Sequence, residues 1–172
     1  MISSGNLILF SNLLGSISGG FEYAIHSYAA NARQAAELKV KDRNNRPGVV
    51  LLGSKSGSDA LGYFIEVFSS FGTYLYKFDG SGINRTEINH DTTAFANDDV
   101  LRVEYESDTD TFTIKQNGTT VWTQSDSTYT SGSIGVGANV GSSTADDWFA
   151  YEDAGTAAGD EVLLSRRSVS MP

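Results

Sequence analysis

Apolar and polar residues alternate along much of this chain with the period of two that is typical of β-strands. In residues 99–107 (DVLRVEYES), Leu101, Val103 and Tyr105 are expected to face a core, and the residues between them to face water. Residues 111–116 (TFTIKQ) continue this pattern after a turn. The alternation predicts strands that are buried on one face only.

A hairpin is predicted around the dipeptide Asn117-Gly118. A two-residue type I′ turn needs positive φ at both central positions, and Asn-Gly is the pair that adopts it most readily. Residues 111–116 would then pair with residues 119–124 (TTVWTQ), with Phe112 and Ile114 turned towards the core. The Asn-Gly turn therefore sets the register in which these two strands pair.

The remaining segments are short and have strand-like patterns or composition. Further strands are predicted at residues 48–53, 62–70, 73–80, 83–88, 133–140 and 146–153. Only residues 32–38 (ARQAAEL) have a helix-favouring composition. They run into residues 37–42 (ELKVKD), which alternate like a strand, so we expect any helix to be about one turn long. The fold class is therefore all-β, an antiparallel sandwich of two sheets. We expect an N-terminal extension or edge strand at 1–20, the sandwich at 21–153 and a C-terminal tail at 154–172.

Length, charge and composition restrict the possible partners and location of the protein. The chain has 172 residues, which suits a single domain, and a net charge of −9, which argues against a nucleic-acid partner. The absence of cysteine excludes disulfides and thiolate metal sites. The apolar run in residues 6–19 lacks a preceding Lys or Arg and is too short to span a bilayer. We therefore expect no export signal, no membrane insertion and synthesis in the cytoplasm.

With the strands placed, residues 35–153 resemble the concanavalin A-like lectin and glucanase superfamily, closest in style to its LamG-like modules. The resemblance lies in GYFIEVF, in LRVEYESDTDTFTIKQNGTTVW and in DSTYTSGSIGVGA. It implies a jelly-roll sandwich. Members of this superfamily differ in what they bind, so the function has to be argued from a site.

The glucanases of that superfamily carry two Glu and one Asp in an E-x-D-x-x-E arrangement on one strand. A retaining mechanism needs two carboxyl groups about 5–5.5 Å apart. Here Glu66 stands alone in the strand with the similar pattern, and Glu104 and Glu106 read as the solvent side of an amphipathic strand. We expect no catalytic residues.

Metal and cofactor sites are not favoured either. His26 and His90 are the only histidines and lack a metal-type spacing. The segments NHDTT (89–93) and SDTD (107–110) offer oxygen ligands for Ca²⁺, but Asx-rich turns explain them as well. We expect no metal and no cofactor, and leave a Ca²⁺ ion in an Asp-rich turn open.

Aromatic residues are the feature that points to binding. If Tyr63 faces the core, Phe64 lies on the opposite face, and Tyr74 and Tyr76 share one face of the next strand. Exposed aromatic rings stack on the apolar faces of sugars, although a sandwich core also needs aromatic residues. The candidate carbohydrate-binding residues are Trp122, Tyr74, Tyr76 and Phe64.

Three functions are consistent with these observations. The first is a non-catalytic virion structural protein of a phage, such as a capsid decoration or tail component, that also binds host-surface carbohydrate. It would contact other virion subunits through its terminal extensions, with Arg166 and Arg167 in an assembly tail, and would form a homo-oligomer. The second is a carbohydrate-binding module of a secreted, extracellular or cell-surface protein. The third is a glucanase-type hydrolase.

Overall fold

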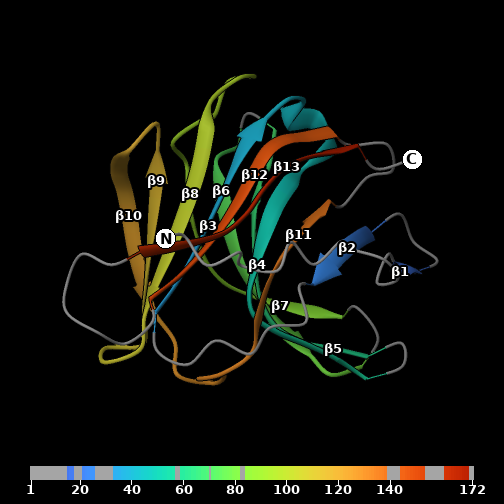
Figure 1. The fold of residues 1–172 in the computed structure, drawn as a ribbon, viewed down its shortest axis with the longest axis vertical. Helices are drawn as coiled ribbons and strands as arrows, with labels where there is room; N and C mark the ends of the chain where they lie inside the picture. The colour runs from blue at the N-terminus through green and yellow to red at the C-terminus, as the bar shows by residue number, and fades with distance from the viewer. Residues whose placement is uncertain are drawn as a thin grey trace, which may run out of the picture.

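Two antiparallel β-sheets pack face to face in this computed structural model, which describes residues 15–17, 21–25, 33–56, 59–69, 71–81, 84–138, 144–153 and 161–170 (Figure 1). The first sheet has seven strands in the order β1 (Gly15–Ile17), β2 (Phe21–Ile25), β11 (Ser133–Ala138), β4 (Pro47–Ser56), β5 (Asp59–Val67), β6 (Thr73–Asp79) and β7 (Arg85–Asp91). The second has six strands in the order β10 (Thr119–Ser125), β9 (Thr111–Gln116), β8 (Val100–Glu106), β3 (Arg33–Val40), β12 (Thr144–Asp153) and β13 (Glu161–Ser170). The predicted all-β sandwich is confirmed.

The core between the sheets consists of the inward-facing half of each strand. Leu101, Val103 and Tyr105 of β8 are buried there, as the alternation predicted. Tyr63 of β5, in the first sheet, belongs to the same core, and its ring lies 4.6 Å from that of Phe112 of β9, in the second sheet. Each large apolar side chain that is fully buried stabilises the fold by about 1.5–3 kcal/mol. The alternating pattern therefore accounts for the main stabilising contacts of the sandwich.

The predicted hairpin at Asn117-Gly118 is also confirmed. Asn117 has φ 50° and Gly118 has φ 82°, the positive values that a type I′ turn needs. Strand β9 pairs with β10 in the register Thr119 opposite Gln116, and Phe112 and Ile114 are fully buried. Asn117 has a second role, because its Oδ1 accepts a hydrogen bond from the backbone N–H of Val100 at 2.9 Å.

The structure differs from the sequence expectation in two segments. Residues with helix-favouring composition form one strand with the alternating residues that follow them, and this strand, β3, pairs with β8 and β12 in the middle of the second sheet. The burial of alternate side chains from Ala36 to Val40 outweighs the helix propensity of the alanines, because tertiary packing overrides intrinsic propensity. The expected tail at 154–172 contains β13, whose residues Arg166 and Arg167 lie opposite Phe149 and Trp148 of β12. That pairing satisfies backbone groups that β12 would otherwise leave unpaired.

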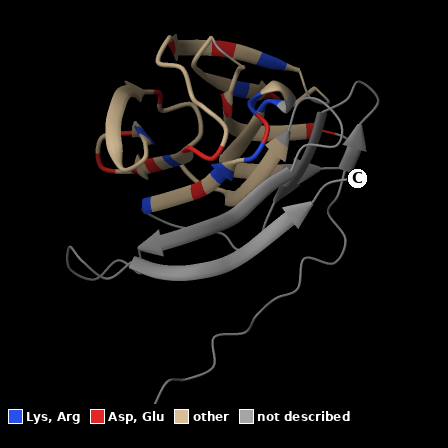
Figure 2. Ribbon diagram, turned by 90° about the horizontal axis from the view of Figure 1, so that it is seen from above, with Lys and Arg blue, Asp and Glu red and all other residues tan. Residues whose placement is uncertain are grey.

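The N-terminal extension expected at residues 1–20 contains β1, which pairs with β2 at the edge of the first sheet. His26 lies outside the described residues. Acidic and basic residues are interleaved along the described strands and loops (Figure 2). In the part of the chain that the structure describes, no helix is long and apolar enough to cross a membrane.

Candidate functional site

The face of the first sheet that points away from the core carries an unusual group of aromatic and charged side chains. In β5, Ile65 and Val67 belong to the core between the sheets, whereas Phe64 packs in a separate apolar cluster on the other face. We call the group on this other face the aromatic face, and its members on β5, β6, β7 and the adjoining turns are Arg46, Phe64, Glu66, Phe68, Phe71, Tyr74, Tyr76, Phe78, Arg85, Glu87 and His90.

Glu66 lies at the base of the aromatic face, and its side chain is 0% exposed. Its carboxylate accepts a hydrogen bond from Nη2 of Arg46, and Nη1 of Arg85 lies 3.4 Å from its Oε2. The side chains of Arg46 and Arg85 are themselves only 19% and 16% exposed. A buried carboxylate needs such partners, because an uncompensated buried charge is strongly destabilising.

Burial changes the pKa values of Glu66, Arg85 and Tyr76. Burial raises the pKa of Glu66, against the opposing charges of Arg85 and Arg46. Burial also lowers the pKa of Arg85, while the nearby Glu66 raises it. The pKa of Tyr76 is raised to about 12, first by burial and then by the charge of Glu66. Tyr76 therefore keeps its phenolic proton across the physiological pH range.

A row of planar groups runs across β6 and β7 above this ion pair. The guanidinium carbon of Arg85 lies 4.3 Å from the ring centroid of Tyr76. The ring of Tyr76 is parallel to that of Tyr74 with centroids 5.9 Å apart, and the ring of Tyr74 is parallel to that of His90 at 4.8 Å. Strand pairing produces this row, because Tyr74 lies directly opposite His90 in the register of β6 and β7.

The row continues onto the turn between β5 and β6. The ring of Phe68 meets Tyr74 edge-on with centroids 5.2 Å apart, and Phe71 lies 5.3 Å from Phe68. Arg46 lies over the Phe68 ring at 3.8 Å, a cation–π contact. Phe71 is 59% exposed, the largest exposure among the large apolar side chains that the structure describes.

This turn is held in place from two sides. Ser69 donates its backbone N–H to the carbonyl of Arg43 at 3.2 Å, and its hydroxyl donates to Oδ1 of Asn44 at 3.2 Å. Gly72 has φ 112°, and a Cβ there would lie 1.8 Å from the carbonyl oxygen of Asp91. The turn that presents Phe71 to solvent is therefore packed tightly against the neighbouring strand.

The four residues predicted to bind carbohydrate occupy different environments. Tyr74 and Tyr76 are half-buried members of the aromatic face. Phe64 is fully buried against Phe78, so its ring forms the base of the face and not its surface. Trp122 lies on β10 in the other sheet, where it packs on the core and donates its Nε1–H to Oγ1 of Thr73 at 2.8 Å. Trp122 thus joins the two sheets.

The other carboxylates singled out in the sequence lie on the outside of the second sheet. Glu104 accepts hydrogen bonds from Nε of Arg102 and from Nζ of Lys115, both at 2.7 Å, and Glu106 pairs with Nε of Arg33 at 2.6 Å. This agrees with their interpretation as the solvent side of β8. Among the described residues, no three His, Asp or Glu side chains are grouped so as to hold a metal ion.

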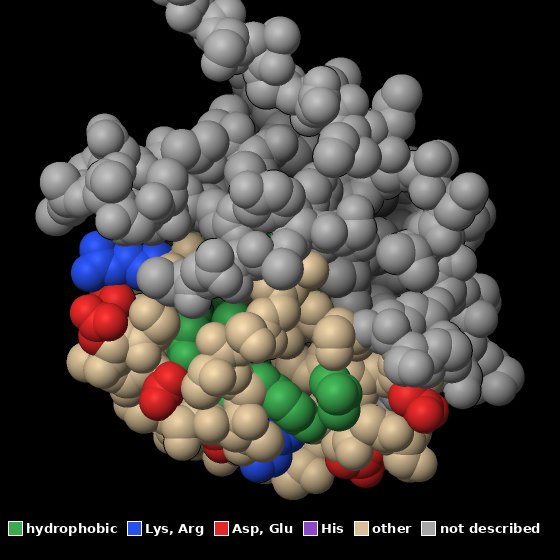
Figure 3. All heavy atoms as spheres, turned by 60° about the horizontal axis from the view of Figure 1, so that its bottom comes forward, with side chains coloured by type: hydrophobic (Ala, Val, Ile, Leu, Met, Phe, Trp, Pro, Cys, Tyr) green, Lys and Arg blue, Asp and Glu red, His purple; other side chains and the backbone are tan. Residues whose placement is uncertain are grey.

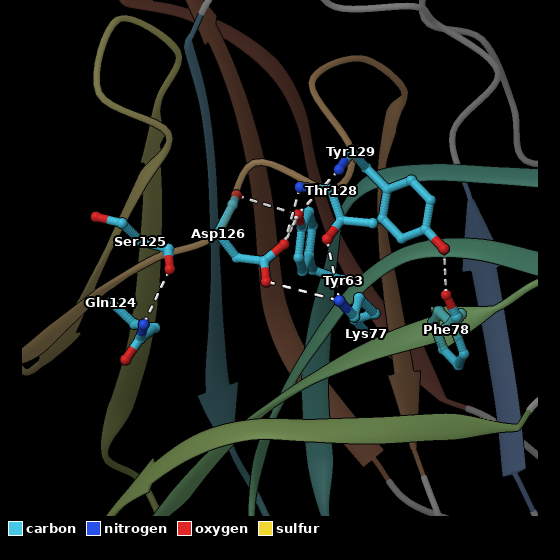
Figure 4. Close-up of polar contacts among 8 residues, drawn as sticks. All are labelled: Tyr63, Lys77, Phe78, Gln124, Ser125, Asp126, Thr128 and Tyr129. Atoms are coloured by element: carbon cyan, nitrogen blue, oxygen red, sulfur yellow. Dashed lines mark hydrogen bonds and ion pairs between the residues drawn. The ribbon is translucent and has the colours of Figure 1, made fainter.

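A second polar cluster anchors the loop between β10 and β11 (Figure 4). The Tyr63 hydroxyl donates to Oδ1 of Asp126 at 2.6 Å and accepts the backbone N–H of Tyr129 at 3.0 Å. Tyr129 in turn donates its hydroxyl to the carbonyl of Phe78, and Lys77 donates to the hydroxyl of Thr128 at 3.0 Å. From the bottom of the view in Figure 1, small hydrophobic patches are visible, with acidic and basic side chains nearby (Figure 3).

Sequence reasoning missed Arg46, Arg85 and Phe71. Arg46 precedes β4 and Arg85 begins β7, so each is far from Glu66 in the chain. The only available signal was a lone Glu66 in an apolar strand, which needs a cationic partner if it is buried. It could not identify that partner.

Comparisons with known proteins concern the fold. Neither a family model nor the sequence of a curated protein matches this chain. Among solved structures, the carbohydrate-binding module CBM66 from Bacillus subtilis is similar, with a TM-score of 0.56, 18% identity and coverage of 70% of this chain and 75% of that one.

Two galectins are also similar, with lower TM-scores. Galectin LEC-6 from Caenorhabditis elegans has a TM-score of 0.42 at 17% identity, and the match covers 77% of this chain and 97% of the galectin. Sheep galectin-11 has a TM-score of 0.44 at 10% identity, with coverage of 76% and 97%. The similarity to the bacterial module supports the jelly-roll β-sandwich fold of this chain.

Proposed function

We propose that this protein is a non-catalytic carbohydrate-binding protein whose site is the open part of the aromatic face, around Phe71, Tyr74 and His90. The observation that carries the proposal is the exposed ring of Phe71, which is continuous through Phe68 with the row of parallel rings. Flat apolar rings beside polar groups suit the faces and hydroxyls of a pyranose or furanose. The lectin-like fold supports the same function.

The site is built for binding without large rearrangement. Glu66 holds two guanidinium groups in place, and both of them contact aromatic rings of the face. The turn carrying Phe71 is restrained by Gly72 and by its hydrogen bonds to the β3–β4 connection. A preformed platform loses less conformational freedom when a ligand binds.

The test is glycan-array binding followed by Phe71→Ala. We expect the variant to lose array binding while its circular dichroism spectrum and unfolding midpoint stay unchanged, since Phe71 is mostly exposed. Leu61→Ala is the matched control, because Leu61 is also an exposed apolar residue of the first sheet, at 38%, but lies at the far end of β5. Equal loss of binding in both variants, or no binding by the parent protein, would contradict the proposal.

Trp122 is the alternative contact residue. Its indole is partly buried and already uses its N–H, which favours a structural role. Binding that survives Phe71→Ala but is lost in Trp122→Phe would move the proposed site to the edge formed by β10.

A hydrolytic function is not favoured. A retaining glycosidase needs one protonated and one ionised carboxyl group about 5–5.5 Å apart, both reaching the substrate. Glu66 is fully buried and bound to two guanidinium groups, so it is poorly placed to reach a sugar. We therefore expect no turnover of a β-glucan; turnover of a β-glucan by the parent protein would overturn this view.

The role as a phage virion component stays a prediction from the sequence, as do assembly through Arg166 and Arg167, a homo-oligomeric state and a location in the virion. A carbohydrate-binding decoration or tail protein would combine this role with the proposed site. Copurification with particles and a symmetric oligomer in light scattering are the expected results. A monomer found only in culture medium would favour the module of a secreted protein instead.

A further inference from the structure

His90 ends the row of parallel rings at the open edge of the first sheet. Its imidazole is parallel to the Tyr74 ring within 13°, and its side chain is 44% exposed. Strand β7, which carries it, is the edge strand of the first sheet in the described part of the chain. A ligand on the aromatic face would therefore meet the imidazole beside the aromatic platform.

Glu87 determines how the two ring nitrogens of His90 are used. Its Oε1 lies 2.8 Å from Nδ1 of His90. A carboxylate only accepts hydrogen bonds, so in the neutral imidazole Nδ1 carries the proton and Nε2 is left as an acceptor. Nε2 forms no hydrogen bond with any side chain in the part of the chain that the structure describes.

The position of the ring is fixed by its neighbours. The side chain of Asn89 accepts the backbone N–H of His90 at 2.9 Å and donates to Oε1 of Gln124 on β10 at 2.7 Å. Tyr74 supports the ring from β6. The imidazole is thus held in one orientation before any ligand arrives.

We infer that His90 contacts the ligand by accepting a hydrogen bond from a sugar hydroxyl at Nε2, and that Glu87 is the positioning residue that keeps this nitrogen an acceptor. The inference rests on the proposed carbohydrate site and names its ligand class. A site with an available acceptor and the 43% exposed carboxylate of Glu87 beside it selects neutral, hydroxyl-rich glycans. An acidic glycan would bring a like charge next to Glu87.

The first test needs no ligand. Long-range ¹H–¹⁵N correlation spectra of the imidazole, recorded where it is neutral, report which nitrogen carries the proton. We expect the Nδ1–H form in the parent protein and a shift towards the Nε2–H form in Glu87→Gln, whose amide can also donate. Glu104→Gln is the control, because it removes the same charge on the other sheet. A dominant Nε2–H form in the parent protein would overturn the inference.

The second test measures retardation in native gels that contain either a neutral galactan or polygalacturonate, its acidic counterpart. We expect retardation by the galactan only. His90→Phe keeps an aromatic ring beside Tyr74 but removes the acceptor, and should weaken galactan binding by about three- to tenfold, the value of one hydrogen bond. Glu87→Gln should also weaken galactan binding and reduce the preference for galactan over polygalacturonate.

The outcomes distinguish the role of His90 from carbohydrate binding by the protein as a whole. Stronger binding of polygalacturonate, or unchanged galactan binding in His90→Phe, would overturn the role of His90 while leaving carbohydrate binding intact. Failure to bind either polysaccharide or any glycan of the array would overturn the proposed function and the ligand class with it. The tautomer spectra would still decide whether Glu87 positions His90.

Discussion

The Oε2 atom of Glu66 lies 3.4 Å from Nη1 of Arg85, and the Glu66 side chain is fully buried although the pair sits on the outer face of a sheet. Ion pairs on an exposed sheet face contribute little because water screens them. Here the rings of the aromatic face exclude that water, and Arg46 supplies a second cation. The cluster is therefore a small polar core of its own, separate from the apolar core between the sheets.

Replacing Glu66 by Gln should be strongly destabilising. The variant would leave two guanidinium groups partly buried without their carboxylate, and breaking such a pair costs about 3–5 kcal/mol. Urea unfolding followed by fluorescence measures the change. Glu104→Gln is the matched control, with an expected loss of about 0–1 kcal/mol because that carboxylate is partly exposed. Similar losses in both variants would show that Glu66 is not a buried anchor.

Replacing Gly72 by Ala should destabilise the turn that presents Phe71. The new Cβ would lie 1.8 Å from the carbonyl oxygen of Asp91, and φ is 112°, where an L side chain is strained. We expect the free energy of unfolding to fall by about 1–3 kcal/mol from backbone strain. Glycan binding should also become weaker.

Gly118→Ala is the control for this prediction. Its φ is 82°, yet nothing lies within 4 Å of the new Cβ. The free energy of unfolding of Gly118→Ala should fall by about 1–2 kcal/mol because of the left-handed conformation alone. The variant should keep its glycan binding. Equal effects of the two substitutions on binding would argue against a role of the turn in the site.

Replacing Trp122 by Phe should affect stability and leave binding unchanged. The Phe ring would keep most of the packing on the core, but the hydrogen bond from Nε1 to Thr73 would be lost. The oxygen of Thr73 would then stay buried without that donor, at a cost of about 1–3 kcal/mol. The midpoint of urea unfolding and glycan-array binding of the same variant check both parts.

Acid should weaken the anchoring of the β10–β11 loop through Asp126. Burial acts to raise the pKa of this carboxyl, but hydrogen bonds from Thr128 and Tyr63 outweigh it and lower the pKa below its ordinary value. A lowered pKa means that the folded state binds the proton less readily than the unfolded state. The resulting stability is present above the ordinary Asp pKa of about 3.9 and is lost as the pH falls towards the folded value.

The free energy of unfolding should therefore decline less steeply in Asp126→Asn than in the parent protein below about pH 4, near the ordinary Asp pKa. At neutral pH the variant should be less stable by about 1.5–3 kcal/mol, the value of a hydrogen bond to a charged group. Urea titrations at several pH values measure both quantities. Parallel pH profiles would show that Asp126 does not contribute.

The elements with clean alternation were the predictable ones. Leu101, Val103 and Tyr105 are buried as β8 required, and the Asn117-Gly118 turn has the backbone angles that its residues favour. In both cases the signal lies within a few neighbouring residues. Strand β13 was missed because its composition gave no clear strand pattern, although it pairs with the preceding strand β12. Only the C-terminal, alternating half of β3 was predicted, because its N-terminal half has helix-favouring composition and its partners β8 and β12 lie far away in the chain.

The candidate site was only half predictable for the same reason. Alternation already placed Phe64 on the face of β5 opposite Tyr63, and Tyr74 and Tyr76 together on one face of β6. It could not show that Phe64 would be buried, nor that Phe71 at a turn would be the exposed ring. Trp122 looked equally suitable in sequence, and its place at the junction of the sheets depends on how they pack.

By itself, the sequence determined the fold class, the inward residues of the regular strands and the Asn-Gly hairpin, because these depend on the period of side chains along a strand and on local backbone preferences. The tertiary structure decided which charged residues meet. Glu66, Arg46 and Arg85 come together through strand pairing and a turn, and His90 joins Tyr74 through the register of β6 and β7. Contacts between distant segments depend on the packing of the whole chain, which no local pattern records.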